Sequence, residues 1–324
     1  MRAIVHEQFG EPEDVLHVAD RPVPEPGPGQ VRVRTTLATI HNHDLWTVRG
    51  TYGFVPDLPA GSGTEAVGVV EALGAGVEAL AIGDRVIAGA FGVWAEQFVA
   101  DAAALMPAPE GLPDEAAAQL VAMPFSAISL LHDLALEPGQ WLVQNAANGA
   151  VGRMVAQLAR ARGIRVVGLV RRLEAVDELR AAGIGDVVAT VHDDWAERVR
   201  NVTGGEPIAA GVDSVGGAAA GDLLSVVGDG GTLIVFGSMD VPVLELPVAE
   251  LIFRQKSVRG FWGSVVSRRM EPAVKQRLFA ELSERVAAGD LTLPVSSTHP
   301  FDDIRKAVRA SLTPGRVGKV LLRP

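Results

Sequence analysis

The chain has 324 residues, of which 48% are hydrophobic, and its 29 basic and 39 acidic residues give a formal net charge of −10. This length allows two domains with separate cores, and the negative charge argues against nucleic acid as a partner. Cysteine is absent, which excludes a disulfide framework, a cysteine nucleophile and a thiolate zinc site.

The sequence carries no pattern of a membrane or targeting segment. The most apolar stretch, 116–131, is interrupted by Gln119 and Pro124 and is shorter than the roughly 20 residues that span a bilayer. Residues 1–5 lack the long apolar core of a signal peptide, and the acidic residues that soon follow are untypical of a transit peptide. We therefore expect a cytoplasmic protein without membrane contact.

Residues 1 to about 120 indicate a β-rich domain. Residues 31–34 alternate between valine and arginine, and short strand-like runs follow at 66–73 and 85–90. Gly- and Pro-rich segments such as 22–29 separate these runs and indicate loops. The composition changes near Asp114, where helical segments begin.

The stretch 141–172 is typical of a strand, a glycine turn, a helix and a second strand. The apolar run at 141–143 precedes a series of small residues, and apolar positions at helical spacing follow them. The continuous apolar run 166–170 is typical of a parallel strand that is buried on both faces. Such a turn places free N–H groups and the positive end of a helix dipole together, which suits the pyrophosphate of a dinucleotide.

The turn carries a partial dinucleotide fingerprint. Gly149 and Gly152 occupy the second and third glycine positions of G-x-G-x-x-G, and Ala147 occupies the first. A strand before it and a helix after it favour a dinucleotide site over a plain packing unit. The residues expected to line the cofactor here are Asn145, Ala147, Asn148, Gly149, Ala150, Val151 and Gly152.

The end of the second strand indicates which dinucleotide binds. An NAD site usually places an Asp or Glu about 20 residues after the glycines, whereas this chain has Arg171 and Arg172 there. Two guanidinium groups can form forked hydrogen bonds to a 2′-phosphate, so the sequence predicts NADPH. The alternative is that both arginines are solvated residues that open the next helix.

The alternation of helices and strands continues after residue 172. Further strands are expected at 186–190, 209–213, 232–236 and 257–262, which complete a six-stranded, doubly wound parallel sheet. Because the ligand of such a sheet lies at the carboxyl ends of its strands, Gly237, Ser238 and Met239 are also expected to line the cofactor. From about residue 263 the chain is expected to return to the first domain.

The domain order and three motifs resemble the medium-chain dehydrogenase/reductase superfamily over essentially the whole chain. The glycine turn at 144–152, with the following pair 170–171, is similar to the fingerprint of the trans-2-enoyl thioester reductases. Residues 251–254, with 259–262 behind them, resemble the sixth-strand motif of that group, and 50–53 match the loop of its catalytic tyrosine. Quinone oxidoreductases of the superfamily match less well, because they usually lack the Phe-Trp pair and this form of glycine loop.

The resemblance implies an α/β fold of two domains. A GroES-like catalytic domain would comprise 1–120, completed by 263–324, and a Rossmann NADPH-binding domain would comprise 121–262. The open edge of the strand at 257–262 would pair with a second copy in a homodimer. Two departures leave the substrate class open: the Asn-Pro-Ser-Asp of the enoyl reductases is 41–44 (His-Asn-His-Asp) here, and one of their tyrosines is Ile128.

The resemblance also bears on metal binding. At the places where zinc alcohol dehydrogenases of this superfamily hold Cys, His-Glu and Cys or His, this chain has His41, 63–65 (Gly-Thr-Glu) and Met123. His41, His43, Asp44 and Glu65 could form a nitrogen and oxygen site, but catalytic zinc normally has three protein ligands and an orienting second shell. We therefore expect no metal, and the histidines would be a polar lining of the active cleft.

Without a metal, hydrogen bonds must stabilise the developing negative charge, which favours reduction of a C=C bond conjugated to a carbonyl. The resemblance places Tyr52, the one tyrosine of the chain, as the proton donor, with His41 and His43 as rival donors and a packing role as the alternative. Phe54 and Trp262 would bound the acyl pocket unless they are core residues. The predicted function is an NADPH-dependent enoyl thioester reductase, and the alternatives are an NADPH:quinone oxidoreductase and a non-catalytic NADPH-binding protein.

Overall fold

The computed structural model describes residues 1–239 and 242–324, which divide into two compact units. Unit 1 comprises Met1–Met123 and Thr292–Pro324, and unit 2 comprises Pro124–Leu291. The segment 263–291 belongs to unit 2, so this division differs from the predicted return of the chain at residue 263. The predicted domain limits stay a prediction.

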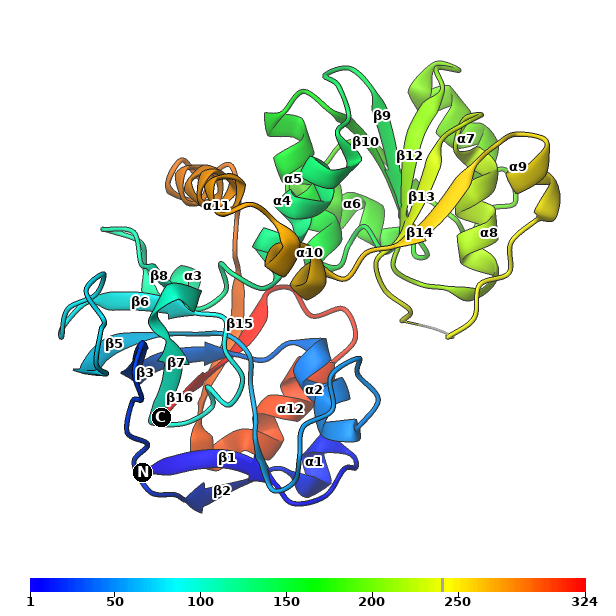
Figure 1. The fold of residues 1–324 in the computed structure, drawn as a ribbon. Helices are drawn as coiled ribbons and strands as arrows, with labels where there is room; N and C mark the ends of the chain where they lie inside the picture. The colour runs from blue at the N-terminus through cyan, green and yellow to red at the C-terminus, as the bar shows by residue number, and fades with distance from the viewer. Residues whose placement is uncertain (240–241) are drawn as a thin grey trace. The chain divides into compact units, whose positions relative to one another are not determined.

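The centre of unit 2 is a six-stranded sheet in which all neighbouring strands are parallel (Figure 1). Its strands are β9 (Trp141–Gln144), β10 (Arg165–Val170), β11 (Val187–Ala189), β12 (Ile208–Asp213), β13 (Thr232–Val235) and β14 (Ser257–Gly260). The spatial order β11-β10-β9-β12-β13-β14 is that of a doubly wound sheet. The predicted fold class is therefore confirmed, although β14 ends at Gly260 rather than at Trp262.

Helices cover both faces of this sheet, and Figure 1 shows α5 and α6 on one side of the strands and α8 on the other. The helices of unit 2 are α4 (Met123–Leu134), α5 (Ala150–Ala161), α6 (Glu174–Ala181), α7 (Trp195–Thr203), α8 (Gly217–Val226), α9 (Val248–Ile252), α10 (Gly263–Arg269) and α11 (Pro272–Ala287). Ala156 of α5 and Leu179 of α6 belong to one apolar cluster, and Val199 of α7 and Leu223 of α8 belong to another. Burial on both faces explains the continuous apolar runs of the strands.

Unit 1 contains a seven-stranded mixed sheet and a three-stranded sheet. The large sheet has the order β15-β16-β3-β5-β6-β8, with β7 also paired to β3, and the small sheet has the order β2-β1-β4. The strands are β1 (Arg2–His6), β2 (His17–Asp20), β3 (Gln30–Thr39), β4 (Ala60–Gly61), β5 (Ala66–Leu73), β6 (Arg85–Ala88), β7 (Gln97–Asp101), β8 (Leu105–Pro107), β15 (Val295–Pro300) and β16 (Lys319–Arg323).

The valines of β3 explain how this sheet is oriented. Val31 and Val33 are fully buried, whereas Arg32 between them and Arg34 after them keep contact with water. This alternation confirms the period of two that the sequence indicates. The buried face packs on an apolar core that also contains Ile304 of the C-terminal part of the unit.

Short helices surround the sheets of unit 1. They are α1 (Pro12–Val15), α2 (Asn42–Arg49), α3 (Asp114–Ala117) and α12 (Ile304–Leu312), with single 3-10 turns at Ala102–Ala104 and Phe301–Asp303. The sequence does not predict α2, which carries the predicted site residue His43 and begins directly after His41. Within residues 1–239 and 242–324, no helix is both long enough and apolar enough to cross a membrane.

Candidate active site

The fingerprint turn of unit 2 lies between β9 and α5. Gly149 is the N-cap of α5, so no N-cap side chain occupies the first N–H groups of this helix. A Cβ atom on Gly152 would lie 2.8 Å from both the carbonyl oxygen of Ala146 and the Cα of Ala147. Only glycine permits so close an approach of the helix to the turn, and the arrangement fits the pyrophosphate of a dinucleotide at the helix N-terminus.

Asn145 ties the ends of two strands together. Its side-chain amide N–H donates to Oδ1 of Asp213 at the end of β12, and its Oδ1 accepts the backbone N–H of Ser214 at 2.8 Å. Oδ2 of Asp213 in turn accepts the N–H of Gly216 at 3.1 Å. Asn145 therefore shapes the carboxyl edge of the sheet, and its contact with the cofactor stays a proposal.

The other predicted cofactor residues lie at the same edge, because the strands are parallel. Arg171 and Arg172 directly follow β10 and are exposed. Arg172 lies 3.8 Å from Glu178, and both side chains are about half exposed, so this ion pair is weak. The segment Gly237, Ser238 and Met239 follows β13, and the N–H of Met239 donates to the carbonyl of Ser214 at 3.1 Å. Ser214 is not among the residues predicted from the sequence, although its position directly after the carboxylate of Asp213 at a strand end is a usable signal.

In unit 1, the predicted histidines flank the start of α2. His41 is the N-cap of this helix, and its backbone N–H donates to Oδ2 of Asp44 at 2.8 Å. The helix ends at Arg49, because Gly50 adopts a left-handed conformation with φ 74° that favours glycine. The turn after Gly50 carries Tyr52.

His41 forms a fully buried pair with Glu65. His41 Nε2 and Glu65 Oε2 are 2.7 Å apart, and both side chains are fully buried. Glu65 Oε1 accepts the backbone N–H groups of Val121 and Ala122. Burial lowers the pKa of His41 well below its ordinary value, which keeps the imidazole neutral, and burial raises the pKa of Glu65 to about 8.

Lys319 of β16 adds a buried cation near this pair. Burial and the neighbouring Arg316 lower the pKa of Lys319 to about 8, while Glu65 and Asp44 act in the opposite direction. Lys319 also lowers the pKa of His41 through its charge. Lys319 is not among the residues predicted from the sequence, because nothing in the sequence around it indicates that its side chain is buried.

The buried carboxyl of Glu65 predicts a dependence of stability on pH. Its pKa is about 8 when folded against an ordinary 4.5, so the folded protein keeps a proton that the unfolded chain releases between these values. The contribution of Glu65 to the free energy of unfolding is therefore expected to fall as the pH rises from 4.5 to 8, by up to about 1.4 kcal/mol per pH unit, while the lowered pKa values of His41 and His43 act in the opposite direction below about pH 6.5. The pKa of Lys319 lies at the upper end of this window, so its titration acts mainly above it.

Glu65→Gln tests this dependence, because an amide keeps the acceptor for Val121 and Ala122 but cannot ionise. Urea unfolding at about pH 5.5 and about pH 7.5 is expected to show a smaller loss of stability for Glu65→Gln than for the wild type. Glu78→Gln, at an exposed position, is the matched control. Equal slopes in the wild type and in Glu65→Gln would contradict the prediction.

The three predicted catalytic rings form one stack. The ring centroids of His41 and His43 are 4.9 Å apart with an interplanar angle of 11°, and those of His43 and Tyr52 are 5.6 Å apart with an angle of 27°. His41 is fully buried, His43 is 16% exposed and Tyr52 is half-buried. The structure thus brings these side chains together, while their catalytic roles stay proposals.

The residues of this cluster do not fit the zinc site of the alcohol dehydrogenases. His41 Nε2 contacts Glu65, and the resemblance puts Thr64 where those enzymes have their histidine. Among the residues that the structure describes, no group of three or more His, Cys, Asp or Glu side chains is placed to hold a metal ion. That the protein works without a metal stays a prediction.

The two aromatic residues predicted for the substrate pocket are both partly exposed. Phe54 of unit 1 is 46% exposed and meets Phe91 edge to face, with ring centroids 5.2 Å apart. Trp262 of unit 2 is 39% exposed and is the N-cap of α10. Neither residue lies in a core, which favours the binding interpretation over the packing interpretation.

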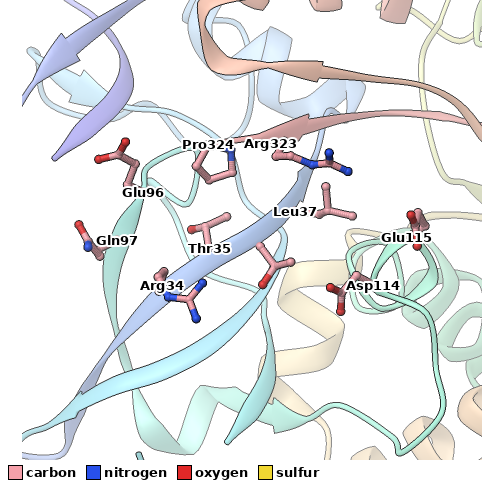
Figure 2. A pocket seen from close by; sticks show the side chains of 10 residues that line it. Arg34, Thr35, Leu37, Glu96, Gln97, Asp114, Glu115, Arg323 and Pro324 are labelled. Atoms are coloured by element: carbon pink, nitrogen blue, oxygen red, sulfur yellow. The ribbon is translucent and has the colours of Figure 1, made fainter. Parts of the chain in front are cut away.

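A cavity of about 620 Å³ lies elsewhere in unit 1 (Figure 2). Residues of β3, the start of α3 and the end of β16 line it, and Figure 2 shows Arg34, Asp114 and Arg323 among them. Its lining includes none of the predicted site residues. Charges of both signs surround it, and we assign it no ligand.

Comparison with known proteins identifies the family. Residues 27–110 match the family "Alcohol dehydrogenase GroES-like domain", and residues 150–279 match the family "Zinc-binding dehydrogenase". The human mitochondrial enoyl-[acyl-carrier-protein] reductase is 32% identical over 99% of this chain and 88% of that protein.

Solved structures show the same fold along the whole chain. A quinone oxidoreductase from Pseudomonas syringae is 29% identical with a TM-score of 0.89, covering 100% of this chain and 99% of that one. The Escherichia coli quinone oxidoreductase complexed with NADPH is 25% identical with a TM-score of 0.90, covering 100% of both chains. These matches confirm the predicted resemblance. The chain belongs to the medium-chain dehydrogenase/reductase superfamily, where its relatives include enoyl-[acyl-carrier-protein] reductases and quinone oxidoreductases.

Proposed function

We propose that the protein is an NADPH-dependent reductase of α,β-unsaturated carbonyls that acts on 2-enoyl thioesters. The observation that carries the proposal is the stack of Tyr52, His43 and His41, which brings a phenol beside two imidazoles whose pKa values burial lowers. The identity with the human enoyl-[acyl-carrier-protein] reductase supports the substrate class. The NADPH complex of the Escherichia coli relative, together with Arg171 and Arg172, supports the coenzyme.

The proposed reaction adds a hydride to the β carbon and a proton to the α carbon of the substrate. Bound NADPH supplies the hydride. As the π bond between the α and β carbons breaks, an enolate forms and negative charge develops on the thioester oxygen. A hydrogen bond from the Tyr52 phenol stabilises this charge. The same phenol then gives its proton to the α carbon, directly or through a water. The ring of His41 is fully buried, and it stacks on the ring of His43 and so supports it.

An assay of NADPH consumption tests the proposal. Crotonyl-CoA, a quinone and buffer without an acceptor separate the enoyl reductase, the quinone oxidoreductase and the non-catalytic binding protein. Turnover with crotonyl-CoA above that with the quinone supports the proposal, and turnover with the quinone alone would replace it with the second candidate, which the Pseudomonas relative favours. The predicted cytoplasmic location and the lack of membrane and nucleic-acid partners stay predictions.

Trp262 is proposed to contact the acyl chain, because its large apolar ring is partly exposed. Trp262→Ala is expected to raise KM for a long enoyl-CoA about tenfold, while KM for NADPH and for crotonyl-CoA changes little. Steady-state kinetics with both acyl lengths measures this. A parallel rise for NADPH would mean that the side chain acts on the structure instead.

We further propose a homodimer that forms at β14, an edge strand of the parallel sheet. Ile252 and Phe253, which precede this strand, are 54% and 82% exposed, as expected of residues that a second copy covers. Light scattering is expected to give a dimer mass for the wild type and a monomer mass for Phe253→Asp. Ile82→Asp, a change at a 67% exposed residue of unit 1, is the control that keeps the dimer. A monomer mass for the wild type at all concentrations would contradict the proposal.

A further inference from the structure

A short row of hydrogen bonds ends on the imidazole of His43. The hydroxyl of Thr64 donates to Oδ1 of Asp44 at 2.7 Å, and the same Thr64 oxygen lies 2.6 Å from His43 Nε2. The second carboxylate oxygen of Asp44 accepts the backbone N–H of His41 at 2.8 Å. Thr64 therefore contacts the ring of His43 at Nε2, and Asp44 contacts Thr64.

The direction of this row follows from its donors. Burial raises the pKa of Asp44, while the hydrogen bonds from Thr64 and from the backbone of His41 lower it and so favour the carboxylate. As a carboxylate Asp44 only accepts, so Thr64 gives its one hydroxyl proton to Asp44 and its oxygen accepts from His43. Burial lowers the pKa of His43, and the resulting neutral imidazole carries a proton on one nitrogen only. The nitrogen that donates to Thr64 is Nε2, which leaves a lone pair on Nδ1.

We infer that Asp44 and Thr64 are positioning residues that hold neutral His43 as its Nε2–H tautomer, with Nδ1 as a hydrogen-bond acceptor. In this state His43 can align a hydroxyl group or a water, but it has no proton at Nδ1 to give to an enolate. His41 is fully buried and cannot reach a substrate in this structure. Of the three candidate proton donors, the geometry retains Tyr52.

The catalytic part of this inference rests on the proposed function, whereas the tautomer does not. The test is therefore a two-bond ¹H–¹⁵N correlation spectrum of the protein labelled at histidine, which distinguishes a protonated from an unprotonated Nδ1 without substrate. The wild type is expected to show Nδ1 of His43 unprotonated and Nε2 protonated. A protonated Nδ1 in the wild type would overturn the inference.

Substitutions in the row make the test sharper. Asp44→Asn keeps an oxygen for the N–H of His41 and turns an amide N–H towards Thr64, so the hydroxyl should now donate to Nε2 and the proton of His43 should move to Nδ1. Thr64→Val removes the acceptor and should give a mixture of tautomers, whereas Thr64→Ser should retain the wild-type spectrum. An unchanged tautomer in Asp44→Asn would overturn the inference. Thr47→Val, which removes a hydroxyl that donates to the main-chain carbonyl of His43, is the control.

Kinetics provide the second readout. Thr64→Val is expected to lower kcat with crotonyl-CoA at least about tenfold, with KM for NADPH kept and with Thr64→Ser near the wild type. A wild type that shows the Nε2–H tautomer but no enoyl turnover would refute the proposed function and leave the assignment of the tautomer standing. Enoyl turnover together with a protonated Nδ1 would refute the inference and leave the function standing.

Discussion

Replacing Tyr52 with Phe is expected to lower turnover of crotonyl-CoA by about 10² or more at saturating NADPH, without loss of affinity for NADPH. The substitution removes only the hydroxyl, so the ring can still stack on His43. A tyrosine suits the role because its unperturbed pKa of about 10 keeps the phenol protonated at neutral pH until the enolate forms. Stopped-flow measurement of a single turnover would separate the loss in chemistry from any change in binding.

The control for this prediction is Thr51→Ala, in the same turn but at an exposed residue whose hydroxyl bonds the main chain of Trp46. Near-normal turnover of Tyr52→Phe would move the donor role to the histidines. His41→Ala and His43→Ala are then the variants to assay.

Replacing both Arg171 and Arg172 with Ala is expected to weaken NADPH binding by about 3 kcal/mol, or roughly 100-fold in Kd, while NADH binding stays nearly constant. Both side chains are exposed directly after β10, where a 2′-phosphate is expected in this type of sheet. Arg171 is expected to carry the larger share, because Arg172 already lies 3.8 Å from Glu178. Calorimetric titration with both coenzymes measures the difference.

The control is Arg180→Ala, which removes an exposed arginine of α6 whose partner is Asp177. It should weaken neither coenzyme beyond the small effect of one surface charge. If the double variant lost NADPH and NADH equally, the two arginines would act on the structure of the β10 end rather than on the phosphate, and the choice of NADPH would lose its basis.

The sheet of unit 2 could be predicted because each strand is buried on both faces and each helix on one, so that local periodicity reflects burial. The helix α2 could not, because its buried positions include Asp44 and Thr47 beside Leu45 and Val48. A buried carboxylate and a buried hydroxyl break the apolar pattern from which a helix is inferred. Their burial depends on partners such as Thr64, which are distant in the sequence.

The same limit applies to the candidate site. Local motifs are enough to propose the glycine turn and Tyr52, but the environment of Glu65 comes from backbone groups of Val121 and Ala122 and from Lys319. These groups come together only when unit 1 has folded. A sequence can show which side chains are able to ionise, while the pKa of each depends on neighbours that the tertiary fold supplies.

The position of β16 has a consequence for the order in which the protein folds during synthesis. This strand lies between β15 and β3 and pairs Leu321 with Thr39, so the sheet of unit 1 remains unfinished until β16 has left the ribosome. Unit 2 is one continuous segment and can form beforehand. Such non-local pairing slows folding and leaves part of the β3 edge open in the nascent chain. In cells, we expect chaperones that shield unpaired strands to engage residues 1–123 while unit 2 is already compact.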